Sequence, residues 1–205
     1  RPNEVIMSGI IGANLVSGRS SGVISVVEAA GGGAWNLIGT AVADDDASLT
    51  ITGLDSTYDT YCMAGSDLRP ATDGVPMYLR LGDSSGVDSG SSDYDWHRAN
   101  LNNDNTSYTA EDGAGNAFIN MIQDNGNQAG EGGGFVAYLH CPADGSTQPA
   151  VSGHGSVGEN NPARYGFAIF GGRRKSVITV DRVQILYSGG NITTGRFTVW
   201  GIAHA

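Results

Sequence analysis

The sequence predicts an all-β protein, and three features of its composition and pattern support that prediction. Glycine accounts for 32 of 205 residues, about twice the ordinary ~7%. Charged residues make up 16% against a usual ~25%, and the helix formers Leu, Lys and Glu are scarce. No window shows the 3.6-residue apolar period of a long helix, whereas short runs alternate apolar and polar residues. We therefore expect a single-domain antiparallel β-sandwich, jelly-roll-like, built from short strands and tight turns.

The first 33 residues are predicted to be an extended N-terminal arm that leads into the sandwich. Ile10-Ile11 and Val23–Val27 are separated by Gly and Ser, and the segment closes on Gly31–Gly33. Such short apolar groups are too few to build a core but suffice to lie along a partner. The sequence thus divides into an arm, 1–33, used in assembly, and a sandwich domain, 34–205.

Four strands are expected in the first half of the domain. They cover Trp35–Val42, 48–52, Tyr58–Ala64 and 77–81, and polar turns with Gly, Pro, Asp and Ser separate them. Leu49 and Ile51 alternate with polar neighbours, which is typical of a half-buried strand.

The middle of the chain is more polar, and fewer strands are expected there. Gly82–Asp95 and Pro142–Pro162 are predicted to be long loops. Between and after them, strands are expected at Trp96–Leu101, Phe118–Ile122, Phe135–Cys141 and Tyr165–Phe170. The whole domain would then hold roughly nine or ten strands.

The C-terminal segment is predicted to be a hairpin of two strands, Val183–Tyr187 and Phe197–Ile202. Val183, Ile185 and Tyr187 alternate with Gln184 and Leu186, so this strand has one face on the core.

The last strand is apolar on both faces. Phe197 and Val199 point to one side, and Trp200 and Ile202 to the other, because neighbouring residues of a strand alternate. One pair should fill the sandwich, and the other should meet a second copy of the chain. We expect Phe197 in the core and Trp200 in the contact, because Gly201 leaves room for close approach.

The net charge of −10 argues against a nucleic-acid partner, because affinity for phosphate depends on clustered Lys and Arg. The basic cluster Arg173–Lys175 is short, and a solvated turn is preferred over a binding patch. No apolar run of about 18 residues is present, so no membrane-spanning helix is expected.

No catalytic, cofactor or metal residue is predicted. Gly153–Gly158 fits the pattern G-x-G-x-x-G, but no helix-opening sequence follows it. The polar loop holds spaced carboxylates without the closing Glu of an EF-hand, so a solvated turn is preferred over a calcium site; they are Asp83, Asp88, Asp93 and Asp95. The histidines show no zinc-ligand spacing, and no G-x-S-x-G motif occurs.

The two cysteines, Cys62 and Cys141, each fall in an apolar strand pattern. Two buried reduced thiols are the preferred interpretation, and a single bridge between facing strands is the alternative.

A sugar site is a second hypothesis. Asp93, Tyr94, Trp96 and Tyr108 lie in or beside the long polar loops, and aromatic faces flanked by Asp and Asn are what a carbohydrate site needs. The structural alternative is that Trp96 packs on the core and the tyrosines cover its edge.

Three stretches of the sequence resemble a group of virion structural proteins of tailed bacteriophages. They are GLDSTYD at 53–59, DSGSSDY at 88–94, and the ending SGGNI at 188–192 with Gly195 and WGI at 200–202. The resemblance spans roughly Trp35 to Ala205, and its motifs are turns and strand ends. It implies a small β-sandwich that serves as a decoration, fibre or adsorption component of the particle.

The expected function is therefore that of a non-enzymatic virion structural protein, assembled in the host bacterial cytoplasm. It should form a homo-oligomer, with a trimer favoured, and contact other virion proteins as a head decoration or a tail or fibre component. A receptor- or glycan-binding tail adsorption module is the alternative, and a phage-borne hydrolase is the third hypothesis.

Overall fold

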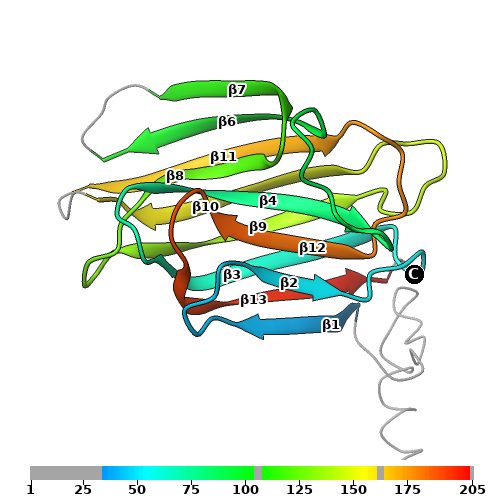
Figure 1. Cartoon of the computed structure of the whole chain (residues 1–205), viewed down its shortest axis with the longest axis horizontal. Coiled ribbons are helices and arrows are strands. Elements are labelled where there is room, and N and C mark those ends of the chain that lie inside the picture. Colours follow the sequence, from blue (N-terminus) through cyan, green and yellow to red (C-terminus); the bar gives the residue numbers. More distant parts are fainter. Residues whose placement is uncertain (1–33, 104–107, 161–163, 204–205) are drawn as a thin grey trace, which may run out of the picture. The chain divides into compact units, whose positions relative to one another are not determined.

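The computed structural model describes residues 34–103, 108–160 and 164–203, which form two antiparallel β-sheets packed face to face (Figure 1). This part of the chain contains strands and no helix. The predicted fold class, an all-β antiparallel sandwich, is confirmed. The predicted arm, 1–33, lies outside the described residues.

The larger sheet has eight strands. Across the sheet they are β1 (Trp35–Val42), β13 (Ile192–Ile202), β3 (Thr60–Pro70), β9 (Gly132–His140), β10 (Ala150–Gly158), β11 (Tyr165–Arg174), β6 (Tyr94–Asn102) and β7 (Thr109–Asn116).

The smaller sheet covers one face of the larger one. Its strands are β2 (Leu49–Thr52), β12 (Arg182–Tyr187), β4 (Val75–Asp83) and β5 (Gly86–Val87), and β8 (Ile119–Asn125) pairs with β4.

The predicted C-terminal hairpin is wrong, because β12 and β13 belong to different sheets. β12 pairs with β2 and β4, and β13 pairs with β1 and β3, so each strand has both edges occupied. The turn between them carries the chain across the sandwich. The chain crosses in the same way between β1 and β2, β2 and β3, and β3 and β4.

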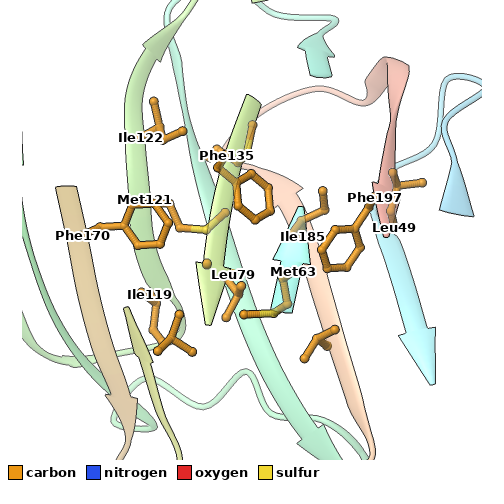
Figure 2. Packing of buried hydrophobic residues seen from close by; sticks show 14 of the residues in the cluster. Leu49, Met63, Leu79, Ile119, Met121, Ile122, Phe135, Phe170, Ile185 and Phe197 are labelled. Atoms are coloured by element: carbon orange, nitrogen blue, oxygen red, sulfur yellow. The ribbon is translucent and has the colours of Figure 1, made fainter. Parts of the chain in front are cut away.

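The core lies between the two sheets, as Figure 2 shows. Val183, Ile185 and Tyr187 are buried and their neighbours are not, as the alternation along this strand predicted. Phe135 lies at the centre, with ring centroids 6.5 Å from Phe170 and 6.1 Å from Phe197. Each large apolar side chain buried in this way contributes about 1.5–3 kcal/mol.

Three strands lie where loops were expected, and the shortest of them, β5, falls inside the predicted loop 82–95. β10 falls inside the predicted loop 142–162, and β7 falls in the polar stretch after Leu101. In β10, a Cβ at Gly153 would lie 2.6 Å from the Val136 carbonyl oxygen, and one at Gly155 would lie 2.4 Å from Ile122 Cδ1. Close packing therefore requires glycines in a strand whose sequence resembles a loop.

Candidate subunit interface

The face of the larger sheet that points away from the smaller sheet is called the outer face. Directly paired residues of an antiparallel ladder point to the same side, so the register assigns each residue to a face. Eight large apolar residues are exposed in the described chain, and six of them are on the outer face: Trp35, Leu37, Val42, Leu101, Tyr165 and Ile169. Apolar exposure is thus concentrated on one surface rather than scattered.

Two rows of paired residues cross the middle of this face. The first, the tryptophan row, runs through Leu37, Trp200, Cys62, Tyr138, Ser152, Gly171, His97 and Asp112. The second, the valine row, runs through Thr40, Thr198, Ala64, Val136, His154, Ile169, Ala99 and Ala110. Their single carboxylate is Asp112 on the edge strand β7, and they contain no Lys or Arg. In a chain of net charge −10, these two rows avoid like-charge repulsion, and the Arg173–Asp95 ion pair lies beside them on the same face.

Large side chains from β1, β13 and β9 occupy one half of the outer face, and β3 contributes the smaller Cys62 and Ala64 between them. Trp35 meets Trp200 edge to face, with ring centroids 6.1 Å apart at 61°. Leu37 lies opposite Trp200 and is 63% exposed, and Tyr138 follows on β9 in the same row. We call Trp35, Leu37, Trp200 and Tyr138 the ridge.

The last strand separates its apolar pairs as its alternation predicted. Phe197 and Val199 are fully buried in the core, and Trp200 and Ile202 lie half-buried on the outer face. The core position of Phe197 is therefore confirmed, and Phe197 and Val199 cannot contact a partner. The contact made by Trp200 and Ile202 stays a prediction.

Gly201 does not leave room for a partner, contrary to the expectation from the sequence. A Cβ at Gly201 would lie 2.2 Å from the ring of Tyr58, which packs against the core. The glycine therefore makes room for Tyr58 on the inner side and not for a partner on the outer side.

The other half of the outer face is hollowed into an open trough of about 1120 Å³ over β10, β11, β6 and β7. Small residues form it: Gly171 is paired with His97, and Ala99 with Ala110. Ile169 stands in the trough and is 56% exposed. Ser152 and Asp112 place polar groups along its sides.

Near the trough, the Nε2 atom of His140 lies 3.0 Å from Ser152 Oγ. A nucleophilic serine needs a base that a third group orients. In the described part of the chain, no carboxylate is hydrogen-bonded to His140, so the pair supports no catalytic assignment.

The structure does not bring the four candidate sugar contacts together. Tyr94 is buried, and its hydroxyl donates to the carbonyl oxygens of Leu81 at 2.9 Å and Asp88 at 3.0 Å. Trp96 belongs to the core cluster, as expected under the alternative in which it packs on the core and binds no sugar. Of the two remaining residues, Asp93 pairs with Arg174 and Tyr108 is exposed.

The acidic loop and the basic cluster neutralise each other. Arg174 contacts Asp88 at 2.7 Å and Asp93 at 3.2 Å, and Arg173 contacts Asp95 at 2.9 Å. The hydrogen bond from Arg173 is the main cause that lowers the pKa of Asp95. Among the described residues, no three His, Cys, Asp or Glu side chains gather as metal ligands. These charges therefore hold the loop to the end of β11.

An ion pair between a buried arginine and a partly exposed glutamate was not predicted. The Arg98 side chain is fully buried, donates to Glu111 at 2.6 Å and also hydrogen-bonds Asn120. Burial lowers the pKa of Arg98, and the carboxylate of Glu111 opposes that effect. The pair fastens the edge strand β7 to β6. The sequence holds one sign of this pair, because Arg98 occupies an inward-facing position of β6 between Trp96 and Asn100.

Both cysteines are free thiols. Cys62 lies under the ridge with 1% exposure, and burial raises its pKa to about 11. Cys141 follows the end of β9, has a φ of 53° and is half-buried. Cys141 therefore lies beyond the strand that was expected to include it, and the buried thiol is confirmed for Cys62 alone.

The glycine pattern Gly153–Gly158 lies entirely within β10, and no helix follows it in the described chain, so it is not a dinucleotide loop.

No family model, curated protein or solved structure matches this chain. The described residues include no helix long and apolar enough to cross a membrane. The surface with the clearest functional character is therefore the outer face.

Proposed function

We propose that the protein is a non-enzymatic structural subunit of a tailed-phage virion that self-associates through the outer face. The tryptophan and valine rows carry this proposal, because an acidic chain exposes apolar side chains there and almost no carboxylate. Elsewhere two copies of net charge −10 repel each other. A surface without that repulsion suits a second copy of the same chain.

The size of the face is sufficient for a stable contact. Strands lie about 4.8 Å apart and rise about 3.4 Å per residue, so eight strands of 8 to 11 residues present roughly 1,200 Å². A standard interface buries about 800 Å² on each partner. The outer face can therefore supply a whole interface.

Support for the virion comes from the sequence resemblance. The three similar stretches lie in the turn between β2 and β3, in the loop before β6, and in the turn before β13 together with β13 itself. We assign the protein to the particle as a trimeric head decoration or a tail or fibre component, in contact with other virion proteins.

Self-association is tested by light scattering on the purified chain and two matched variants. Leu37→Glu places a charge on the exposed ridge and should reduce the mass to that of a monomer. Thr52→Glu, on an exposed position of the smaller sheet beside Arg182, should leave the mass unchanged. A wild-type protein that is monomeric at all concentrations would overturn the proposal.

The virion assignment has a separate test. Peptides of this chain should be found by mass spectrometry in phage particles purified by density gradient. Their absence from such particles, with the protein abundant in the lysate, would contradict a structural role in the virion.

Glycan binding is the second candidate function, and the trough is the observation that favours it. His97, Asp112 and Ser152 offer hydrogen-bonding groups around a floor of small residues. A glycan array probed with the wild-type chain and with Ile169→Glu tests this. Binding that Ile169→Glu abolishes would favour an adsorption module.

A further inference from the structure

We infer that the copies join with the ridge of one subunit seated in the trough of another. This inference rests on the proposed self-association and specifies its geometry. A contact between two different patches closes into a ring when the rotation allows it, and a three-membered ring is one such closed form.

In and beside the tryptophan row, the two halves of the outer face differ in side-chain size. The ridge presents two indole rings, a phenol and a leucine, whereas the row continues with Ser152 and Gly171, and Ala99 and Ala110 lie beside it on β6 and β7. In the tryptophan row, a Cβ built at Gly171 would lie 3.4 Å from the His97 ring. The imidazole therefore leans over the glycine, which keeps the trough floor low.

A two-fold contact of ridge on ridge would leave half of the apolar surface in water. Ile169 is 56% exposed and Leu101 is 48% exposed, and both lie on the trough half. A contact of ridge in trough covers both halves of every subunit, either reciprocally between two copies or around a closed ring. The larger apolar area buried favours that arrangement, at roughly 25 cal/mol per Å².

The polar groups of the two halves are also complementary. An indole N–H donates only, and Trp35 and Trp200 bring two of them to the ridge. The exposed carboxylate of Asp112, at the far end of the tryptophan row, accepts only. Tyrosine, tryptophan and apolar anchors in a concave site are typical of interface hot spots.

Complementation between two variants tests the geometry. Leu37→Glu disables the ridge and Ile169→Glu disables the trough, and both residues are exposed enough for the monomer to fold. Each variant alone should raise the dissociation constant by about thirty-fold or more, as expected for a hot spot. An equimolar mixture should form a complex of two subunits, because one native ridge still faces one native trough. The chain with both substitutions should rescue neither variant.

A photo-crosslinker at position 37 of the otherwise native chain gives a second readout. Benzoylphenylalanine there should link to 97–99, 110–112 or 169–171 of the neighbouring copy. Links to 35–37 or 200 instead, or a mixture that stays monomeric while Ile169→Glu alone stays oligomeric, would overturn the contact of ridge in trough and leave self-association intact. A wild-type chain that is monomeric would overturn the proposed function itself.

Discussion

The environment of Cys62 predicts a difference in reactivity between the two thiols. The thiolate is the reactive form, and burial both covers Cys62 and raises its pKa to about 11. Near neutral pH we expect one thiol per native chain, that of Cys141, to react with a thiol-specific disulfide reagent, and two to react in denaturant. Cys141→Ser should abolish the native reaction, and Cys62→Ser should leave it unchanged. Rapid native labelling of both thiols, or a covalent dimer that persists in Cys141→Ser, would contradict the structure.

Asp144 gives a prediction about acid pH. Its carboxylate accepts hydrogen bonds from the Ser146 amide at 2.8 Å, the Ser146 hydroxyl at 2.7 Å and the Thr147 hydroxyl at 2.8 Å. These bonds, with that of the Ser146 hydroxyl the largest cause, lower the pKa of Asp144 to about 2. A folded-state pKa below the unfolded value stabilises the turn above about pH 4, and the stabilisation is lost as the pH falls through about 2.

Carbon-detected NMR titration of the Asp144 carboxyl measures this pKa. Ser146→Ala should raise it, because one hydroxyl donor is lost and the backbone amide remains. Ser188→Ala, in the turn between β12 and β13, serves as the control and should have no effect. An unchanged midpoint in Ser146→Ala would show that the turn does not hold the carboxylate.

Single residues show where sequence reasoning ends. The alternation along the last strand placed Phe197 in the core, because a strand's period fixes which side chains share a face. Tyr94 and Trp96 were expected beside a polar loop and are buried instead. The Tyr94 hydroxyl is satisfied by the backbone of Leu81, which is remote in sequence. No local pattern reveals such a distant partner.

Among the elements, β13 serves two roles, and two substitutions should separate them. Phe197→Ala removes a buried aromatic and should lower the free energy of unfolding by about 3–5 kcal/mol. Trp200→Ala removes a half-buried ridge residue and should mainly shift the oligomer toward monomer. Unfolding is measured by denaturant titration in the Leu37→Glu background, so that dissociation does not contribute, and assembly is measured by light scattering. Trp200→Ala that remains fully oligomeric would contradict the role of the ridge.

Strands with clear apolar alternation were located from the sequence, and the others were not. β12 and β4 were found because each has a regular buried face. β10 was missed because its glycines hide the period, and they are required by neighbours that lie far away in the sequence. β7 was missed because the ion pair of its Glu111 with the buried Arg98, rather than apolar side chains, holds it to the sheet.

At the scale of the whole molecule, composition was enough for the fold class but not for the strand order. The predicted terminal hairpin failed because adjacent strands of this chain repeatedly enter opposite sheets. Local sequence gives the direction and the apolar face of a strand, whereas the choice of sheet depends on which edges remain free. The outer face became visible only when residues from eight strands were placed in register.

The charge of the whole molecule predicts how assembly responds to salt. Each copy carries a net charge of −10, and the rows of the proposed contact carry almost none of it. Repulsion between copies is therefore long-range and is screened by salt, since the Debye length falls from about 14 Å at 0.05 M to about 4 Å at 0.5 M. The apolar contact itself is not weakened by this screening. We expect the dissociation constant, measured by sedimentation velocity, to decrease as NaCl rises over this range, and Leu37→Glu to stay monomeric throughout. A dissociation constant that increased with salt would mean that charge pairs such as those of Arg173 and Asp95 hold the copies together, and it would contradict an apolar interface.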